Sequence, residues 1–168
     1  MEDYSAALVA LRDRLAAGLT APFHTEQNIP VCGRVCALHA WFDEAAEAKF
    51  MGLLSMGGAV THSHEHRMLF AVPDLTDEAL DDWWAFARRC QDELVCPDAA
   101  HQFTLISFYL VYGAASPRAL RRLRRLSSEI NYKKPQFGWS SIRLCAVEAG
   151  SGKTTVNRMG KPLAELLR

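Results

Sequence analysis

The chain has 168 residues, and its 19 basic and 19 acidic side chains cancel to a formal net charge of zero. This length is enough for one domain with a buried core, and 49% hydrophobic with 23% charged residues excludes a disordered or fibrous chain. No apolar run approaches the ~20 residues that cross a bilayer, and the N-terminus lacks the pattern of a secretion signal. Five cysteines argue against a disulfide framework. We therefore expect a single cytoplasmic domain over residues 1–168, with no membrane partner.

The first half of the chain predicts helices and two strands. Leucines at helical spacing open the chain, two prolines without periodicity follow, and a near-continuous apolar run then favours a buried strand. Asp43 is well placed to cap a second helix, which a pair of glycines would end. The expected elements are an N-terminal helix over 1–20, a linker over 21–30, a strand over 31–42, a helix over 44–54 and a strand over 67–72.

The second half continues the alternation. Thr76 precedes two acidic residues and Ser116 precedes a proline, and both patterns are typical of helix starts. The expected elements are a helix over 77–94, a strand over 103–112, a helix over 117–130, strands over 141–148 and 154–157, and a final helix over 162–168. Three β-α units in succession predict a three-layer α/β fold. Its sheet should be mostly parallel, with the N-terminal helix added at the start and an antiparallel hairpin at the end.

Residues 150–155 read GSGKTT, which are letters of a phosphate-binding loop. That loop requires a glycine at position 147, where this chain has Val147, and a helix directly after the motif. The residues that follow, TTVNRMG, favour a strand and a turn instead. We therefore expect a tight turn at Gly150, Ser151 and Gly152 between two antiparallel strands, and no nucleotide cofactor.

Three histidines alternate at His62, His64 and His66. On a strand they would share one face, with neighbours about 6.6–6.8 Å apart, so at most two of them could bind one zinc ion in regular geometry. Further ligands would have to come from His39, His101 or a cysteine. The alternative, which we favour, is a polar lead-in to the strand at 67–72, with no metal.

The same stretch resembles, at His62 and His64, the H-x-H-x-D-H signature of metallo-β-lactamase-fold hydrolases. His66 and Arg67 stand where that signature has its aspartate and its last histidine, so the second metal would lack ligands. No family is assigned from this resemblance. A zinc-dependent hydrolase centred on the 62–66 cluster is kept as the third hypothesis.

The charges are segregated along the chain. Residues 74–98 hold eight acids against two arginines, and residues 116–134 hold seven bases against one acid. Opposite patches of this kind steer protein association. The acidic helix also carries adjacent tryptophans that cannot both point inward, and an exposed Trp83 would be typical of a binding hot spot. The residues expected at this partner surface are Asp81, Asp82, Trp83, Arg121, Arg122, Arg124 and Arg125.

The basic helix 117–130 is followed by an aromatic loop over 131–141 that includes Tyr132 and Trp139. Cations interleaved with aromatic rings are typical of sites for single-stranded nucleic acid. Against this, a nucleic-acid domain is usually basic overall, and this chain is neutral. Because each catalytic motif fails on spacing or context, we expect a non-catalytic protein that binds another protein or itself. The nucleic-acid-binding accessory protein is the second hypothesis.

Overall fold

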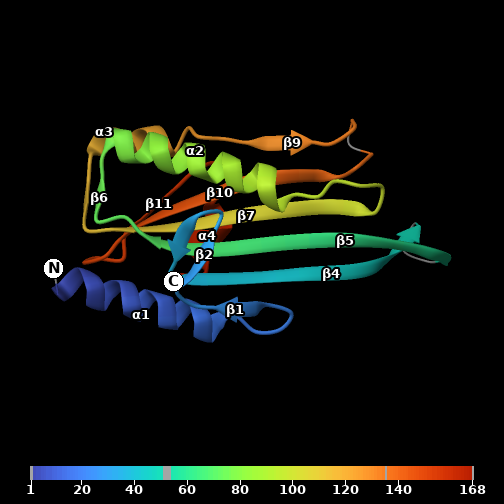
Figure 1. Ribbon diagram of the computed structural model, residues 1–168, viewed down its shortest axis with the longest axis horizontal. Coiled ribbons are helices and arrows are strands. Elements are labelled where there is room, and N and C mark those ends of the chain that lie inside the picture. Colours follow the sequence, from blue (N-terminus) through green and yellow to red (C-terminus); the bar gives the residue numbers. More distant parts are fainter. Residues whose placement is uncertain (1, 51–53, 135, 168) are drawn as a thin grey trace.

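The computed structural model describes residues 2–50, 54–134 and 136–167 (Figure 1). In these residues no helix is long and apolar enough to cross a membrane. The elements, in chain order, are α1 (Glu2–Gly18), β1 (His24–Glu26), β2 (Ile29–Val31), β3 (Arg34–Cys36), β4 (Leu38–Phe50), β5 (Leu54–Ala71), β6 (Asp74–Leu75), α2 (Asp77–Leu94), β7 (His101–Tyr112), β8 (Ala114–Ala115), α3 (Pro117–Leu123), β9 (Glu129–Asn131), β10 (Trp139–Glu148), β11 (Thr154–Val156) and α4 (Lys161–Glu165).

The central sheet is mixed, so the expectation of a mostly parallel sheet is confirmed only in part. Its seven strands follow the order β1-β4-β5-β7-β10-β11, and β9 pairs with β10. Only the β5–β7 and β7–β10 pairs are parallel; β1–β4, β4–β5, β9–β10 and β10–β11 are antiparallel. The difference arises because β4 and β5 form a hairpin where a helical crossover was expected.

The helix expected over 44–54 is absent from its described part, because residues 44–50 continue β4. The sequence there is rich in helix formers. Pairing with β5 nevertheless provides a backbone partner along the strand, with Asp43 opposite His64 and Ala45 opposite His62. Tertiary pairing of this kind overrides a weak local propensity. Residues 51–53 of the expected helix lie outside the described residues.

Several further boundaries differ from the expectation: the linker expected over 21–30 contains β1 and the start of β2, β5 begins well before residue 67, and α4 ends at Glu165. The strand expected over 31–42 is broken by a turn at Cys32 and Gly33, whose φ angles are 48° and 85°, and β2 and β3 pair across that turn. The basic helix ends at Leu123 instead of residue 130, because residues 129–131 form β9 on the edge of β10. The basic segment is therefore a short helix, a turn and a strand.

Other local predictions are confirmed. The Thr76 hydroxyl accepts a hydrogen bond from the Ala79 N–H at 3.1 Å and caps α2, and the Ser116 hydroxyl caps α3 with Pro117 in the first turn. The turn after β10 joins it to β11 in antiparallel register, with Val147 opposite Thr154. Gly152 takes a φ of 69° there, which glycine tolerates readily.

Helices cover both faces of the sheet. Alternate side chains of β5 and β7 point to opposite faces, so Phe70 and Phe108 pack under α2 and α3, whereas Leu69 and Tyr109 pack under α1 and α4. The fold is therefore a mixed α/β arrangement with one hydrophobic cluster on each side of the sheet. The long strands run on past the ends of α1 and α2, as Figure 1 shows. That extension carries the polar groups described next.

Candidate functional site

A row of polar residues crosses the three parallel strands on the face that α1 and α4 partly cover. Arg67 of β5 lies opposite Ser107 of β7, and Ser107 lies opposite Arg143 of β10. Two residues earlier on their strands, Glu65 and Ser141 occupy the same face in the neighbouring row. We call these five residues the arginine site. Their place in the centre of the sheet fixes them on rigid elements.

The charges of the arginine site do not balance. The Glu65 carboxylate accepts a hydrogen bond from Arg67 Nε at 2.6 Å, and Arg143 Nη1 lies 3.9 Å from the same oxygen. The three side chains are 7%, 18% and 17% exposed. Burial lowers the pKa of Arg143, Glu65 raises it and Arg67 lowers it further. Since arginine stays protonated in proteins, one carboxylate faces two guanidiniums and a positive charge remains.

Three buried polar atoms at the arginine site lack a hydrogen-bond partner among the described residues. They are Ser107 Oγ, Ser141 Oγ and Arg143 Nε. Both serines have no exposed surface. A buried polar atom left unpaired costs about 1–3 kcal/mol, so native proteins contain only a few of them. Their concentration on two adjacent strands, beside an excess positive charge, indicates a group that accepts hydrogen bonds and carries negative charge.

Aromatic and aliphatic groups shield the arginine site. The Arg67 guanidinium carbon lies 4.4 Å from the centre of the Phe23 ring, which meets Phe42 edge-on at 5.0 Å. Phe23 belongs to the segment between α1 and β1, so this segment covers the guanidinium from outside. Desolvation also raises the pKa of Tyr109, which lies one row further along β7. The site thus combines low solvent access with a positive charge. Because charges attract more strongly where water is excluded, this environment favours a negatively charged ligand.

The opposite face of the sheet gathers all six histidines of the chain, and we call it the histidine face. Their rings form contacts from strand to strand, with His39 against His66 and His64 against His101. His101 is buried. Its Nδ1 lies 2.7 Å from the Phe137 carbonyl oxygen, and its Nε2 lies 2.8 Å from the Thr104 hydroxyl. These bonds assign His101 a role in holding the loop before β10.

The three histidines predicted as zinc ligands do not converge. His66 Nδ1 pairs with His39 Nε2 at 3.1 Å, whereas His62 and His64 each approach Asp43, at 3.7 and 3.5 Å. Burial lowers the pKa of both His39 and His66 to about 4. Across the described ranges, no group of three or more His, Cys, Asp or Glu side chains is arranged to hold a metal ion. Zinc binding stays a prediction.

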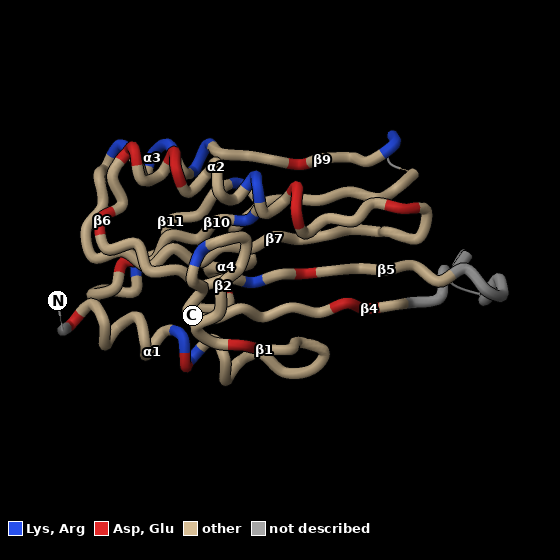
Figure 2. The backbone as a smooth tube through the Cα atoms, viewed as in Figure 1, with Lys and Arg blue, Asp and Glu red and all other residues tan. Residues whose placement is uncertain are grey.

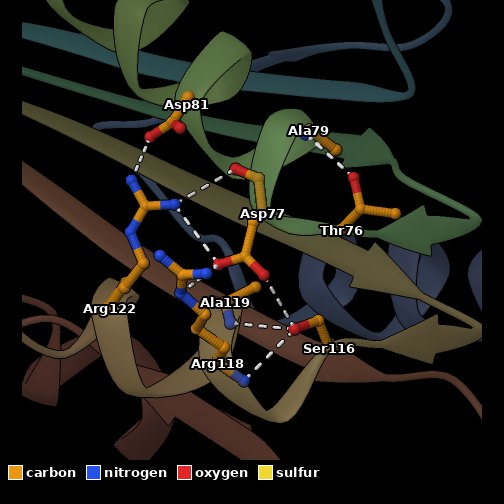
Figure 3. Close-up of polar contacts among 8 residues, drawn as sticks. All are labelled: Thr76, Asp77, Ala79, Asp81, Ser116, Arg118, Ala119 and Arg122. Carbon is orange, nitrogen blue, oxygen red and sulfur yellow. Dashed lines mark hydrogen bonds and ion pairs between the residues drawn. The ribbon is translucent and has the colours of Figure 1, made fainter.

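The acidic and basic segments contact each other at the surface of the same chain (Figure 3). Arg122 of α3 donates hydrogen bonds to Asp77 and Asp81 of α2, and Arg118 lies 3.7 Å from Asp77. On the other side of α2, Asp82 accepts a hydrogen bond from Arg34 at 2.7 Å. Part of the charge expected to face a partner is therefore neutralised within the chain.

Trp83 is half-buried and packs on the core. Its ring lies 5.0 Å from Phe70 and 5.4 Å from Phe86, and the Arg34 guanidinium carbon lies 4.3 Å from its ring centre. This environment leaves only part of the ring available to a partner. In contrast, Arg121, Arg124 and Arg125 are exposed, and no hydrogen bond or ion pair holds their guanidiniums in the described part of the chain. These three arginines belong to the basic residues that the sequence predicted at the partner surface.

The basic helix and the aromatic loop do not form one surface. In Figure 2 the basic residues of α3 and those that follow β9 lie at opposite ends of the molecule. Tyr132 bonds to Ser140 at 2.8 Å under α2, whereas Trp139 packs against Phe103 on the opposite face of the sheet, with ring centres 5.7 Å apart. Tyr132 and Trp139 therefore do not form one surface with the arginines of α3 on which the bases of a nucleic acid could stack.

Sequence reasoning missed the arginine site. The signal was present, since Arg143 and Ser141 interrupt the otherwise apolar strand SIRLCAVE, and Arg67 opens the apolar stretch RMLFAV. A charged residue inside a strand that is buried on both faces needs a partner. The sequence could not show that the two arginines are only two strands apart, because that depends on the strand order.

Comparison with known proteins places the chain in a family without assigning an activity. The family model described as a domain of unknown function, DUF8052, matches residues 9–168, and the chain belongs to that family. No curated protein and no solved structure matches the chain. The function must therefore be argued from the geometry described above.

Proposed function

We propose that this protein is a non-catalytic binding protein whose ligand is a small anion held at the arginine site. One observation carries the proposal: two largely buried guanidiniums share one carboxylate, and one of their N–H groups (Arg143 Nε) and two neighbouring serine hydroxyls lack partners among the described residues. Taking an ion out of water costs several kcal/mol unless other charges and hydrogen bonds compensate. An anion that accepts from Arg143 Nε and the two serine hydroxyls would supply both forms of compensation.

The chemistry of the site fits binding better than catalysis. Guanidinium groups hold carboxylates and phosphates through paired hydrogen bonds of fixed geometry. Glu65 is the acidic group of the site, and its contacts with Arg67 and Arg143 engage it as their counter-charge. The site therefore offers hydrogen-bond donors and positive charge, which are what a bound anion requires.

Calorimetric titration with acetate and with inorganic phosphate, at constant ionic strength, tests the proposal. We expect saturable binding of one anion per chain, weakened about tenfold or more by Arg143→Met, because a hydrogen bond to a charged group contributes roughly 1.5–3 kcal/mol. Arg121→Met, at an exposed arginine of α3, is the matched control and should bind as the wild type does. Equal binding by the wild type and Arg143→Met, or none by the wild type, would refute the proposal.

A second candidate function is association with a protein partner, which includes another copy of this chain. The observation that favours it is the exposed set of Arg121, Arg124 and Arg125, whose charge is not used within the described residues. Such a set would steer an acidic surface toward α3. Light scattering at low and high salt should then show association that salt weakens. A chain that stays monomeric at every salt concentration and binds no acidic protein would exclude this candidate.

A further inference from the structure

A small apolar cavity adjoins the arginine site. It has a volume of about 50 Å³ and lies between the C-terminal half of α1, the sheet and the end of the chain. Its lining is mostly apolar, with Leu19, Leu69 and Tyr109 among the lining residues, and it also includes Arg14 and Arg67. From this arrangement we infer that the anion is the carboxylate of a short, unbranched aliphatic chain. The inference rests on the proposed function and specifies its ligand.

Arg67 connects the charged region to the apolar one. Leu69 and Tyr109 lie opposite each other on β5 and β7, in the row next to Arg67 and Ser107 and on the same face of the sheet. Two residues along a strand span about 6.6–6.8 Å. A carboxylate bound at the Arg67 guanidinium would therefore place the first carbons of its chain near Leu69.

The apolar lining separates a carboxylate from other anions. The hydroxyl of Tyr109 is engaged with the Leu163 carbonyl at 3.3 Å, and Arg14 donates one hydrogen bond to the Leu167 carbonyl, so the charged donors at the cavity are those of Arg14 and Arg67 and the rest of the lining is apolar. A phosphate or sulfate would place further charged oxygens against leucine side chains, where no hydrogen bond compensates them. A methylene chain gains free energy in the same space through the hydrophobic effect.

The volume sets the length of the chain. A cavity needs at least about 10–15 Å³ to hold one water molecule, so a cavity of about 50 Å³ holds roughly three to five groups of the size of a water molecule or a methylene. The carboxylate would lie at the edge of the cavity, against Arg67. The space buries about three or four carbons beyond the carboxylate, as in butyrate or pentanoate, and carbons beyond these gain no further burial there.

Titration of the wild type with acetate, propionate, butyrate, pentanoate and octanoate tests the inference. We expect the dissociation constant to fall about fourfold with each added methylene up to butyrate or pentanoate, and no further fall at octanoate. Leu19→Trp, at the residue after the end of α1, should fill the cavity and remove the dependence on chain length while acetate still binds. Leu120→Trp, at another half-buried leucine, is the matched control and should keep the dependence.

The possible results separate the inference from the proposed function. If acetate and pentanoate bind equally to the wild type, the ligand assignment is wrong and the anion site stands. If affinity keeps rising through octanoate, the assigned chain length is wrong. If no carboxylate and no phosphate binds, the inference and the proposed function both fail. The wild-type series decides among these results even if Leu19→Trp does not fold.

Discussion

Replacing Glu65 by glutamine should destabilise the protein strongly, because it removes the counter-charge of two largely buried arginines. The Glu65 side chain is 7% exposed and contacts both guanidiniums. Breaking a buried ion pair by removing one partner typically costs 3–5 kcal/mol, and the residual exposure of the arginines favours the lower end, about 3 kcal/mol. For a chain of this size that corresponds to a fall in the melting temperature of roughly 6–12 °C.

The opposite result is expected for Arg143→Met. This change removes the guanidinium that Glu65 contacts more weakly and leaves the Glu65–Arg67 pair at 2.6 Å intact. The free energy of unfolding of the variant should therefore lie within about 1 kcal/mol of the wild-type value, or above it. An anion that binds the folded chain and not the unfolded one would add stability in proportion to its affinity.

Thermal unfolding followed by circular dichroism, in a buffer with little small anion, measures both changes. Glu129→Gln, at an exposed carboxylate on β9, is the control and should lie within about 0.5 kcal/mol of the wild type. Acetate added at constant ionic strength should then restore part of the stability of Glu65→Gln. If Glu65→Gln is as stable as the control while Arg143→Met is severely destabilised, the charge imbalance described here is wrong.

Three further predictions concern the rest of the fold. Asn157→Ala should cost about 2–4 kcal/mol by chemical denaturation, because the buried Asn157 amide serves one backbone N–H and two carbonyls that would lose their partner. Thr76→Ala should cost about 1 kcal/mol through loss of the α2 cap, and no loss would contradict that capping role. Burial holds the pKa values of His39 and His66 at about 4, below those of unfolded histidine, so the unfolded chain binds more protons as the pH falls from about 6.5 to 4 and stability should fall across that range. A pH titration of unfolding should show this loss reduced in His66→Gln and kept in His24→Gln, and an unchanged loss in His66→Gln would contradict it.

Local signals predicted the elements that depend on local physics. The caps at Thr76 and Ser116, the glycine turn after β10 and the apolar strand β7 all follow from residue types at fixed offsets, and the structure has them where expected. The β4–β5 hairpin was missed because residues 44–50 favour a helix locally and become a strand only through pairing with β5.

The functional interpretation needed the strand order. Sequence reasoning followed charges that are dense along the chain, such as the arginines of α3, and part of that charge pairs with α2 within the molecule. Arg67 and Arg143 are far apart in sequence and isolated among apolar neighbours, so no local window joins them. Their shared face emerges only when β5, β7 and β10 are placed side by side.

The most direct test of the arginine site observes the unpaired group itself. In a nitrogen-15 NMR spectrum of arginine side chains, the Nε–H signal of Arg143 should shift progressively and saturably as butyrate is added, because that N–H gains an acceptor. The signal of the exposed Arg121 should stay in place. An Arg143 signal that does not move at saturating butyrate, or that moves no more than Arg121, would contradict the central claim that this site binds an anion.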